Sequence, residues 1–448
     1  GFCVDFSSVL NRLDNVRPAP RGTGLAPVLL TTGGYHGTLA AVRALGRAGV
    51  PVVVADSDAF AVARWSCFTR SRVFAPPVRD KQYRFLDWLL AFGKRSRQRH
   101  VLLPTCDDTA WLYARHRDEL SRHFHVSGCS GDAVYGLLNK RQLMAACREV
   151  GIDTPGTRSP SSEAELERVA SAARYPVLIK PTSQVLFESR HKGKEVGDRA
   201  ELLATYRRFR EQRYGDALLA YDASVSWPLV QEYFSTADRS IYNLSGYIGR
   251  DPADSVLRAS RKVLQEREIG VGICFERAQV HAELVQAVRA LFARLGYHGI
   301  FEIEFIPAHG RFYLIDANPR FYGELAFDVA RSMPLPLIAY FDALGDMQAV
   351  RALIAAATEL PDAPRAHMYR VGFEMYLRTQ RFSGALSVEQ QRVWRDWQAA
   401  QGALSDAVHD GEDWVPSLIE TAKRCYLQLR FPAELIQQTA RHRFGFAR

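Results

Sequence analysis

Acidic side chains recur within a short run of alternating apolar residues between positions 301 and 320. Apolar residues alternate around Glu302 and Glu304, which is typical of a strand, and a second apolar run ends at Asp316. His309-Gly310 separates the two runs and predicts a tight hairpin turn. Folding back around that turn places Glu304 opposite Asp316 or one position away from it, at the separation of cross-strand neighbours.

Two carboxylates at that separation repel each other unless a cation lies between them. Asn318 adds an amide oxygen on the same side of the second strand as Asp316. Carboxylate and amide oxygens form a set suited to Mg²⁺, or to Mn²⁺, with water and phosphate oxygens as the remaining ligands. Arg320 adds a fixed cation beside them. A surface hairpin with solvated acids is the alternative, and the bulky apolar neighbours of Glu304 and Asp316 argue against it.

The composition bounds the class of protein. The 448 residues are 47% hydrophobic and 24% charged, as in an ordinary globular protein of two to four structural units. No apolar run approaches the roughly 18 residues of a membrane span. No secretion signal pattern opens the chain, and the seven scattered cysteines form no CxxC. These features predict a cytoplasmic location and no disulfide framework.

The formal charge of +9 favours anionic ligands such as nucleotides or acids. A nucleic-acid-binding protein driven by charge is a rival interpretation, which salt-dependent affinity for DNA or RNA would test. The basic residues, however, are spread along the chain without a recognition helix, zinc finger or RNP-type motif. We therefore expect no nucleic-acid partner.

The first part of the chain predicts a parallel α/β domain over residues 27–135, after a lead-in over residues 1–26. A strand over 28–32, a helix over 38–48 and a strand over 50–56 form a βαβ unit. Gly33-Gly34-Tyr35-His36-Gly37 lies at its first turn and lacks the full spacing of a dinucleotide site. Two interpretations stand equally: a tight turn without a ligand, or backbone N–H groups that bind an anionic substrate group.

Further along, charged residues follow predicted strands. Asp107 and Asp108 come just after a strand, where they either cap the next helix or contact a substrate. Lys180 interrupts the apolar strand 177–180 and needs an anionic partner. Lys192-Gly193-Lys194 follows in a polar stretch that predicts either a phosphate-binding loop or a solvated hairpin tip. Beyond residue 345 the pattern is helical.

The order of these features over residues 28–345 resembles the ATP-grasp ligase superfamily, and within it carbamoyl-phosphate-synthase-like ligases and D-aspartate ligases. The E…D-x-N-P-R ending at Glu304, Asp316, Asn318 and Arg320 is its most specific motif. The resemblance implies a Rossmann-like substrate domain, then a two-lobed ATP-grasp domain over 136–345 (small lobe 136–228, large lobe 229–345) and a helical extension over 346–448. The extension is expected to pack on a neighbouring domain or on the second subunit of a homodimer.

The resemblance also implies roles for individual residues. Glu304, Asp316 and Asn318 would hold the metal ion, and Arg320, Arg261 or Lys262 would face the reacting phosphate. The Gln231 side chain and the backbone of Glu232 and Phe234 would bind adenine. The complete ATP-binding set is Lys140, Lys180, Lys192, Gly193, Lys194, Gln231, Glu232, Phe234 and, as the ribose-binding acid, Asp238.

Such a site would activate a carboxylate as an acyl phosphate with ATP and pass it to an amine, which forms an amide and releases ADP and phosphate. The transfer needs a metal ion and cations around the phosphate oxygens, and little covalent chemistry from the protein. Small-molecule acids and amines are the expected substrates. Two alternatives remain at this point: transfer of the acyl phosphate to a nucleophile other than an amine, and a nucleotide-binding relative without catalysis.

Overall fold

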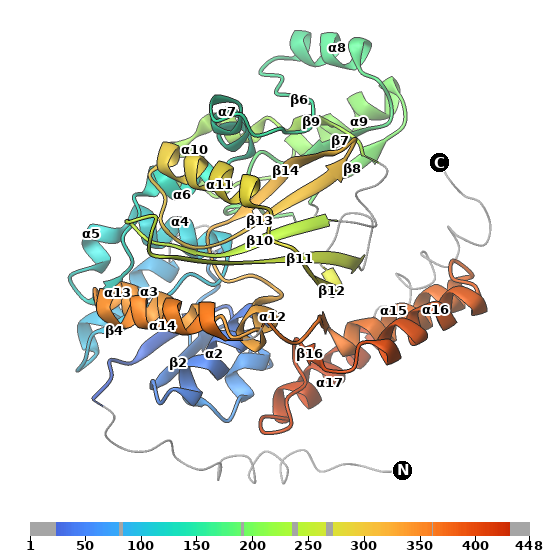
Figure 1. Cartoon of the computed structure of the whole chain (residues 1–448). Coiled ribbons are helices and arrows are strands. Elements are labelled where there is room, and N and C mark those ends of the chain that lie inside the picture. The colour runs from blue at the N-terminus through green and yellow to red at the C-terminus, as the bar shows by residue number, and fades with distance from the viewer. Residues whose placement is uncertain are drawn as a thin grey trace.

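The chain folds around three β-sheets that follow one another along the sequence (Figure 1). The computed structural model describes residues 24–79, 84–189, 192–234, 241–265, 272–360 and 362–430. A parallel sheet precedes two sheets whose pairings are mainly antiparallel. This combination confirms the fold class predicted from the sequence.

The first sheet is parallel and has the strand order β3-β2-β1-β4-β5. Its strands are β1 (Val28–Thr31), β2 (Val52–Asp56), β3 (Thr69–Phe74), β4 (His100–Leu102) and β5 (Phe124–Val126). The accompanying helices are α2 (His36–Arg47), η1 (Val62–Trp65), α3 (Arg84–Arg95), α4 (Asp107–Arg115) and α5 (Arg117–Leu120). The strand order reverses between β1 and β4, so a ligand crevice is expected where these two strands end.

The second sheet is small and antiparallel, in the order β6-β9-β7-β8 (Figure 1, top). It consists of β6 (Thr157–Arg158), β7 (Val177–Lys180), β8 (Lys194–Val196) and β9 (Leu229–Glu232). Its helices are α6 (Gly131–Leu138), α7 (Lys140–Glu149), α8 (Glu163–Ala172), α9 (Arg199–Arg210), α10 (Asp216–Tyr221) and η2 (Ala223–Ser226). Helix α7 begins at Lys140 because the Asn139 side chain accepts hydrogen bonds from the backbone N–H groups of Arg141 and Gln142.

The third sheet has the order β14-β13-β10-β11-β12-β15-β16. Its strands are β10 (Ile241–Ile248), β11 (Ser255–Gln265), β12 (Gly272–Ala278), β13 (Gly299–Ala308), β14 (Arg311–Asn318), β15 (Ala366–Met368) and β16 (Leu404–Asp406). The helices are α11 (Ala282–Leu295), α12 (Leu325–Ala330), α13 (Leu335–Leu344), α14 (Met347–Glu359), α15 (Arg370–Ser383), α16 (Val388–Ala400) and α17 (Val415–Arg430).

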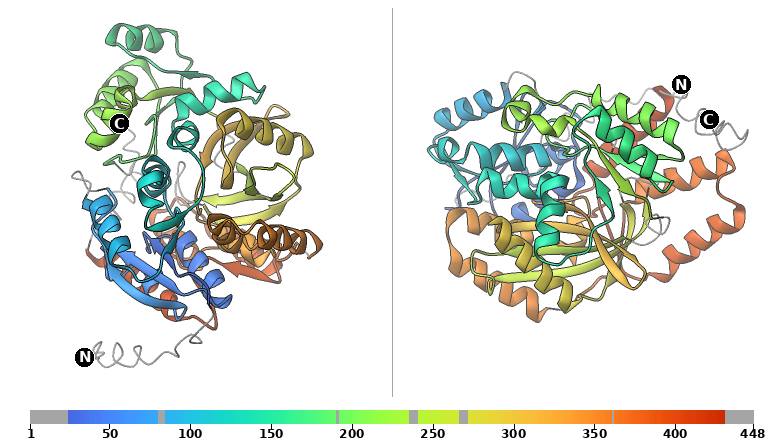
Figure 2. Two further views of the ribbon diagram at one scale, coloured as in Figure 1. Left: turned by 90° about the vertical axis from the view of Figure 1, so that its left-hand side faces the viewer. Right: turned by 90° about the horizontal axis from the view of Figure 1, so that it is seen from above.

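The C-terminal extension is mainly helical, as predicted, but it also adds β15 and β16 to the third sheet. Helices α15, α16 and α17 lie at one side of the molecule (Figures 1 and 2). The end of the predicted extension, residues 431–448, lies outside the described residues. No helix in the described ranges is long and apolar enough to cross a membrane.

A buried ion pair fastens the extension to the first domain. The Asp413 carboxylate accepts hydrogen bonds from Arg43 Nε at 2.8 Å, from Ser66 Oγ at 2.7 Å and from the Cys67 backbone N–H at 2.8 Å. Arg43 also donates to the carbonyls of Val408 and Asp413. Asp413 and Arg43 are both buried, so the extension is held to α2 and η1 by groups shielded from water.

The glycine-rich turn after β1 is explained in part by packing. A Cβ atom on Gly37 would overlap the Tyr322 carbonyl oxygen, which lies on the segment that follows β14. The Gly33 N–H donates to the Asp56 carboxylate at 2.6 Å. Gly37 is therefore required for α2 to approach the segment that follows β14, independently of any ligand.

Candidate active site

The site is built on the hairpin of β13 and β14. His309 and Gly310 form its two-residue turn with φ of +49° and +72°, as the primed turns of hairpins require. Counting from that turn alone would place Ile315 opposite Glu304. A register shift after Glu304 instead pairs Glu304 with Asp316 and Glu302 with Asn318. This bulge brings all four polar side chains to one face of the sheet.

Each carboxylate of the central pair has a lysine partner. Lys140 Nζ lies 2.5 Å from Asp316 Oδ1, and Lys262 Nζ lies 2.7 Å from Glu304 Oε1. Burial alone raises a carboxyl pKa, but Lys140 lowers the pKa of Asp316 to about 2. Burial likewise opposes ionisation of Glu304, and Lys262 nonetheless holds its pKa below the ordinary value. Both groups are therefore anions at neutral pH.

Lys180 lies at the end of β7 and lines the same cavity. It is only 9% exposed. Burial, followed by the charge of Lys140, lowers the pKa of Lys180 to about 8. A buried ammonium group of this kind gains from an anion placed beside it.

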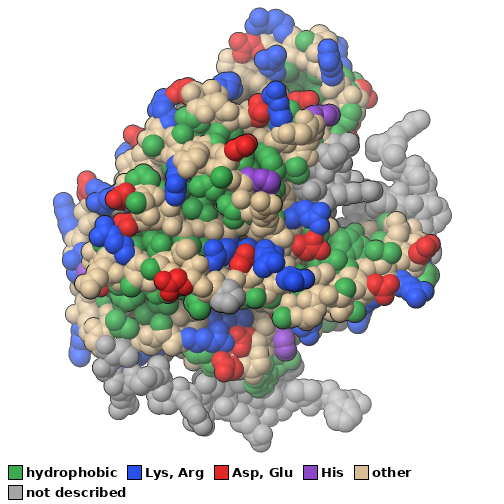
Figure 3. Space-filling view, viewed as in Figure 1, with side chains coloured by type: hydrophobic (Ala, Val, Ile, Leu, Met, Phe, Trp, Pro, Cys, Tyr) green, Lys and Arg blue, Asp and Glu red, His purple; other side chains and the backbone are tan. Residues whose placement is uncertain are grey.

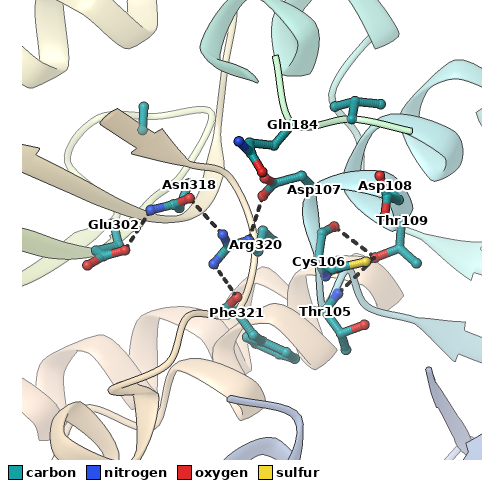
Figure 4. A network of polar contacts seen from close by, with 12 residues as sticks. Thr105, Cys106, Asp107, Asp108, Thr109, Gln184, Glu302, Asn318, Arg320 and Phe321 are labelled. Carbon is teal, nitrogen blue, oxygen red and sulfur yellow. Dashed lines mark hydrogen bonds and ion pairs between the residues drawn. The ribbon is translucent and has the colours of Figure 1, made fainter. Parts of the chain in front are cut away.

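A chain of hydrogen bonds joins the hairpin to the first domain (Figure 4). Asn318 Nδ2 donates to Glu302 Oε2 at 2.7 Å, and Arg320 Nη2 donates to Asn318 Oδ1 at 2.7 Å. Arg320 Nε also donates to Asp107 Oδ1 at 2.7 Å. Burial, Glu324 and Glu304 raise the pKa of Glu302 well above its usual range. Arg320 thus lies between the hairpin of β13 and β14 and the residues that follow β4.

The hairpin fits a divalent ion that shares its ligands with a phosphate. Glu304 and Asp316 supply two ionised carboxylates in register, and Asn318 lies on the same face. The described residues contain no group of three His, Cys, Asp or Glu side chains that could hold a metal ion. Two carboxylates are nevertheless what a Mg²⁺ ion needs when water and phosphate oxygens complete its shell.

The residues proposed for adenine binding also line the cavity. Gln231 is buried, and its amide nitrogen donates to Thr157 Oγ1 at 3.0 Å. The Glu232 backbone N–H is already bonded to the Gly156 carbonyl at 2.8 Å, so it is not a free donor for a base. Phe234 packs on Tyr313 with ring centroids 4.9 Å apart. Apolar side chains accompany it along the cavity: Leu138, Leu178, Ile241, Ile306 and Ile315.

The structure does not bring every predicted residue to the cavity. Arg261 lies opposite Tyr242 in the strand pairing, whereas Lys262 lies opposite the cavity residue Ile241. Adjacent residues of a strand face opposite sides, so Arg261 points away from the site. It forms an ion pair at 2.5 Å with Glu276 instead. Expecting Arg261 at the reacting phosphate is therefore wrong.

The proposed phosphate loop is divided in a similar way. Lys192 lines the cavity, whereas Gly193 and Lys194 do not. Lys194 begins β8 and lies 2.9 Å from Glu201 at the start of α9. Asp238, the ribose candidate, lies outside the described residues.

One cavity of about 970 Å³ connects these groups with the first domain. It runs from Lys140, Lys180 and Phe234 past the hairpin to the ends of β1 and β4, where Thr32, Tyr35 and Asp107 line it. Thr32 Oγ1 lies 2.6 Å from Thr105 Oγ1 across the two strand ends. The cavity therefore joins the region of the buried lysines and the carboxylate hairpin, which is suited to phosphate and a metal ion, to the expected ligand crevice of the parallel sheet.

Several cavity residues were not assigned from the sequence. Glu302 is on β13 and Glu324 follows β14, and the cavity is also lined by three residues of α17: Glu420, Lys423 and Arg424. The sequence contained a signal for Glu302, because residues two apart in a strand lie on the same face and Glu302 is two residues from Glu304. No local pattern could bring α17 to the cavity, since its position depends on contacts with a domain more than 300 residues earlier in the chain.

The arrangement of the three sheets is also found in solved structures of other proteins. The structure resembles an L-amino acid ligase from Bacillus licheniformis, with a TM-score of 0.53 and 13% identity over 72% of this chain and 76% of that one. It also resembles the biotin carboxylase domain of the Hydrogenobacter thermophilus 2-oxoglutarate carboxylase, solved with MgADP. There the TM-score is 0.53 and the identity 14%, over 75% of this chain and 70% of that one. The chain therefore has the fold of the ATP-grasp ligases.

Among curated proteins, the chain is similar to the D-aspartate ligase of Enterococcus faecium. The two sequences are 23% identical over 282 residues, which cover 59% of this chain and 64% of that enzyme. The chain thus spans less than two thirds of the length of this relative. No protein-family model matches the chain.

Proposed function

We propose that the protein is an ATP-dependent carboxylate–amine ligase that uses Mg²⁺. The observation that carries this proposal is the placement of the ionised Glu304–Asp316 pair and Arg320 between two parts of one cavity. One part carries the buried lysines, and the other is the crevice of the parallel sheet. A phosphate donor and a carboxylate acceptor bound in these two parts would meet at the hairpin.

Each residue has a task in that reaction. Lys140, Lys180 and Lys192 would bind phosphate oxygens, while Leu178, Phe234 and Ile315 would enclose the base. Glu304 and Asp316, with Asn318, would hold Mg²⁺, which neutralises charge on the phosphates during transfer. Lys140 and Lys262 are paired with these carboxylates and would become available to phosphate oxygens once a metal ion takes over the carboxylates.

Arg320 reaches from the segment after β14 to the crevice of the first domain, where Asp107 accepts its hydrogen bond. Its guanidinium group would stabilise the acyl phosphate and then the oxyanion that forms when an amine attacks the acyl carbon. The amine loses a proton, the C–N bond forms, and phosphate leaves with the electrons of the C–O bond. Asp107 and Asn318 hold Arg320 in place for both steps.

An ADP-release assay over a matrix of carboxylic acids and amines tests this function. We expect ADP and phosphate only when an acid is present, and an amide product only when an amine is added. Release of phosphate with the acid and a non-amine nucleophile would instead favour the alternative acceptor. Absence of ADP formation with every acid, in a protein that binds ATP, would contradict a ligase.

Small-molecule substrates and a cytoplasmic location are further parts of the proposal. Supporting them, the cysteines within the described residues are free. On the face shown in Figure 3, basic and acidic side chains are interspersed and form no basic stripe. The exposed apolar residues Phe382, Val388 and Val393 of α15 and α16 support packing against a second subunit, which light scattering on the purified chain would test.

A further inference from the structure

Helix α17 of the C-terminal extension lines part of the cavity. Glu420, Lys423 and Arg424 lie on one face of this helix, since residues three and four apart are neighbours on a helix surface. All three line the same cavity as Lys140 and Arg320. The extension therefore contributes charged side chains to the space in which the substrates of the proposed ligase would bind.

The position of α17 is fixed by the fold. Strand β16 pairs with β15 in the third sheet, and Asp413, two residues before the helix, is buried against Arg43 of α2. Within the helix, Glu420 is buried and accepts hydrogen bonds from Tyr369 and Arg424. These contacts fix the helix in place as part of the cavity wall.

Lys423 differs from its neighbours in how it is paired. Its Nζ lies 2.5 Å from Oδ2 of Asp58, which follows β2 in the first domain. The two side chains are 35% and 43% exposed, respectively, whereas Glu420, the partner of Arg424, is buried. An ion pair open to solvent contributes little to stability, so a ligand anion can take the place of Asp58 at small cost.

We propose that α17 forms a wall of the substrate subsite and that Lys423 binds an acidic group of the substrate in exchange for Asp58. This inference rests on the proposed ligase function and assigns its substrate class. One of the two substrates carries an anionic group, a carboxylate or a phosphate, in addition to its reacting atoms. The C-terminal extension is then a specificity element of the enzyme.

Direct binding to the full chain tests the assignment without requiring turnover. Isothermal titration, with and without MgADP, would compare aspartate, glutamate and phosphoserine with their neutral congeners asparagine, glutamine and serine. The variants are Lys423→Met, which removes the cation, and Asp58→Asn, which frees it. The control is Lys94→Met, which removes an exposed lysine of α3 outside the cavity. Thermal unfolding of each variant checks its fold.

We expect an acidic ligand to bind the unaltered protein at least about tenfold more tightly than its neutral congener, as one charge-assisted hydrogen bond allows. Lys423→Met should abolish that preference, Asp58→Asn should preserve or strengthen it, and Lys94→Met should leave it unchanged. The carboxylate and phosphate members separate the two sources of the anion.

Three results would overturn the assignment: no preference for any acidic ligand, equal preference in Lys423→Met, or a loss in Asp58→Asn as large as that in Lys423→Met. Failure of the proposed function gives a different pattern. In that case the binding preference and its dependence on Lys423 persist, while no acid supports ADP release from ATP.

Discussion

Lys180 provides a sharp test of the nucleotide site through proton uptake. Its pKa of about 8 in the free protein means that about half of these side chains are neutral at pH 8. The neutral share is about one tenth at pH 7 and about nine tenths at pH 9. A phosphate placed beside Lys180 raises its pKa again, because an anion favours the charged form. Nucleotide binding should therefore draw a proton from solution.

The expected uptake is about 0.5 proton per bound ADP at pH 8 and about 0.9 at pH 9, falling to about 0.1 at pH 7. Titration calorimetry in two buffers with different ionisation enthalpies measures this number directly. Above pH 8 the apparent affinity should fall with each pH unit, because binding must first protonate the lysine. Lys180→Met should show no uptake at pH 9, while Lys94→Met should keep it.

The reasoning would be refuted by tight ADP binding at pH 9 with no proton uptake in the unaltered protein. Either Lys180 would then keep its ordinary pKa despite burial, or the phosphates would bind elsewhere. A weak-binding Lys180→Met variant that retained the uptake would assign the proton to another group. Measuring the heat at three pH values separates these outcomes, since only a group with pKa near 8 gives the predicted progression.

Three other predictions follow from the geometry. Glu304→Gln or Asp316→Asn should abolish ADP release while circular dichroism and thermal unfolding remain those of a folded protein; normal turnover would remove these carboxylates from the metal site. Lys262→Met should lower the rate of ADP release by tenfold or more, whereas Arg261→Met, on the opposite face of β11, should stay within about threefold; equal losses would contradict the strand pairing. Asp413→Ala should lower the free energy of unfolding in urea by about 3 kcal/mol, because it removes the buried carboxylate that pairs with Arg43 and accepts hydrogen bonds from Ser66 and the Cys67 N–H. A change below about 1 kcal/mol would show that the pair is not buried in solution.

The hairpin shows how far the sequence determines the site. Alternation of apolar residues and the His309-Gly310 turn predict two strands, and the structure confirms both. The turn alone, however, sets a register that places Asp316 on the wrong face. The bulge after Glu304 corrects this by one residue. A bulge has no strong local signature in the sequence. The sequence therefore leaves two possible registers for the hairpin, which differ in the face of the sheet on which Asp316 lies.

Arg261 and Lys262 of β11 also show that the sequence alone does not decide which side chain faces the cavity. Arg261 and Lys262 are adjacent, and either satisfies a requirement for a cation near the phosphate. Only one can face the cavity, and the pairing of β11 with β10 decides which. Pairing between distant strands is a tertiary property. The sequence can therefore predict a cation at this point of the strand without showing which of the two adjacent residues faces the cavity.

The C-terminal extension was least predictable. Its helices follow from apolar periodicity, but β15 and β16 are three residues each and carry too little pattern to distinguish them from loops. The role of α17 at the cavity depends on where the extension docks. That docking is decided by single polar contacts such as Asp413 with Arg43, which no periodicity reveals.

The Asp413 contact has a consequence for engineering chimeric enzymes. A recombined protein that took its first 130 residues from one parent and its last 100 from another would combine an arginine on α2 with whatever side chain the second parent placed at position 413. Without a matching carboxylate, the buried guanidinium group would lose its shortest ion pair, and the segment before α17 would lose a buried contact with the first domain. The beginning and the end of this chain should therefore be exchanged together, with crossover points placed inside the intervening lobes.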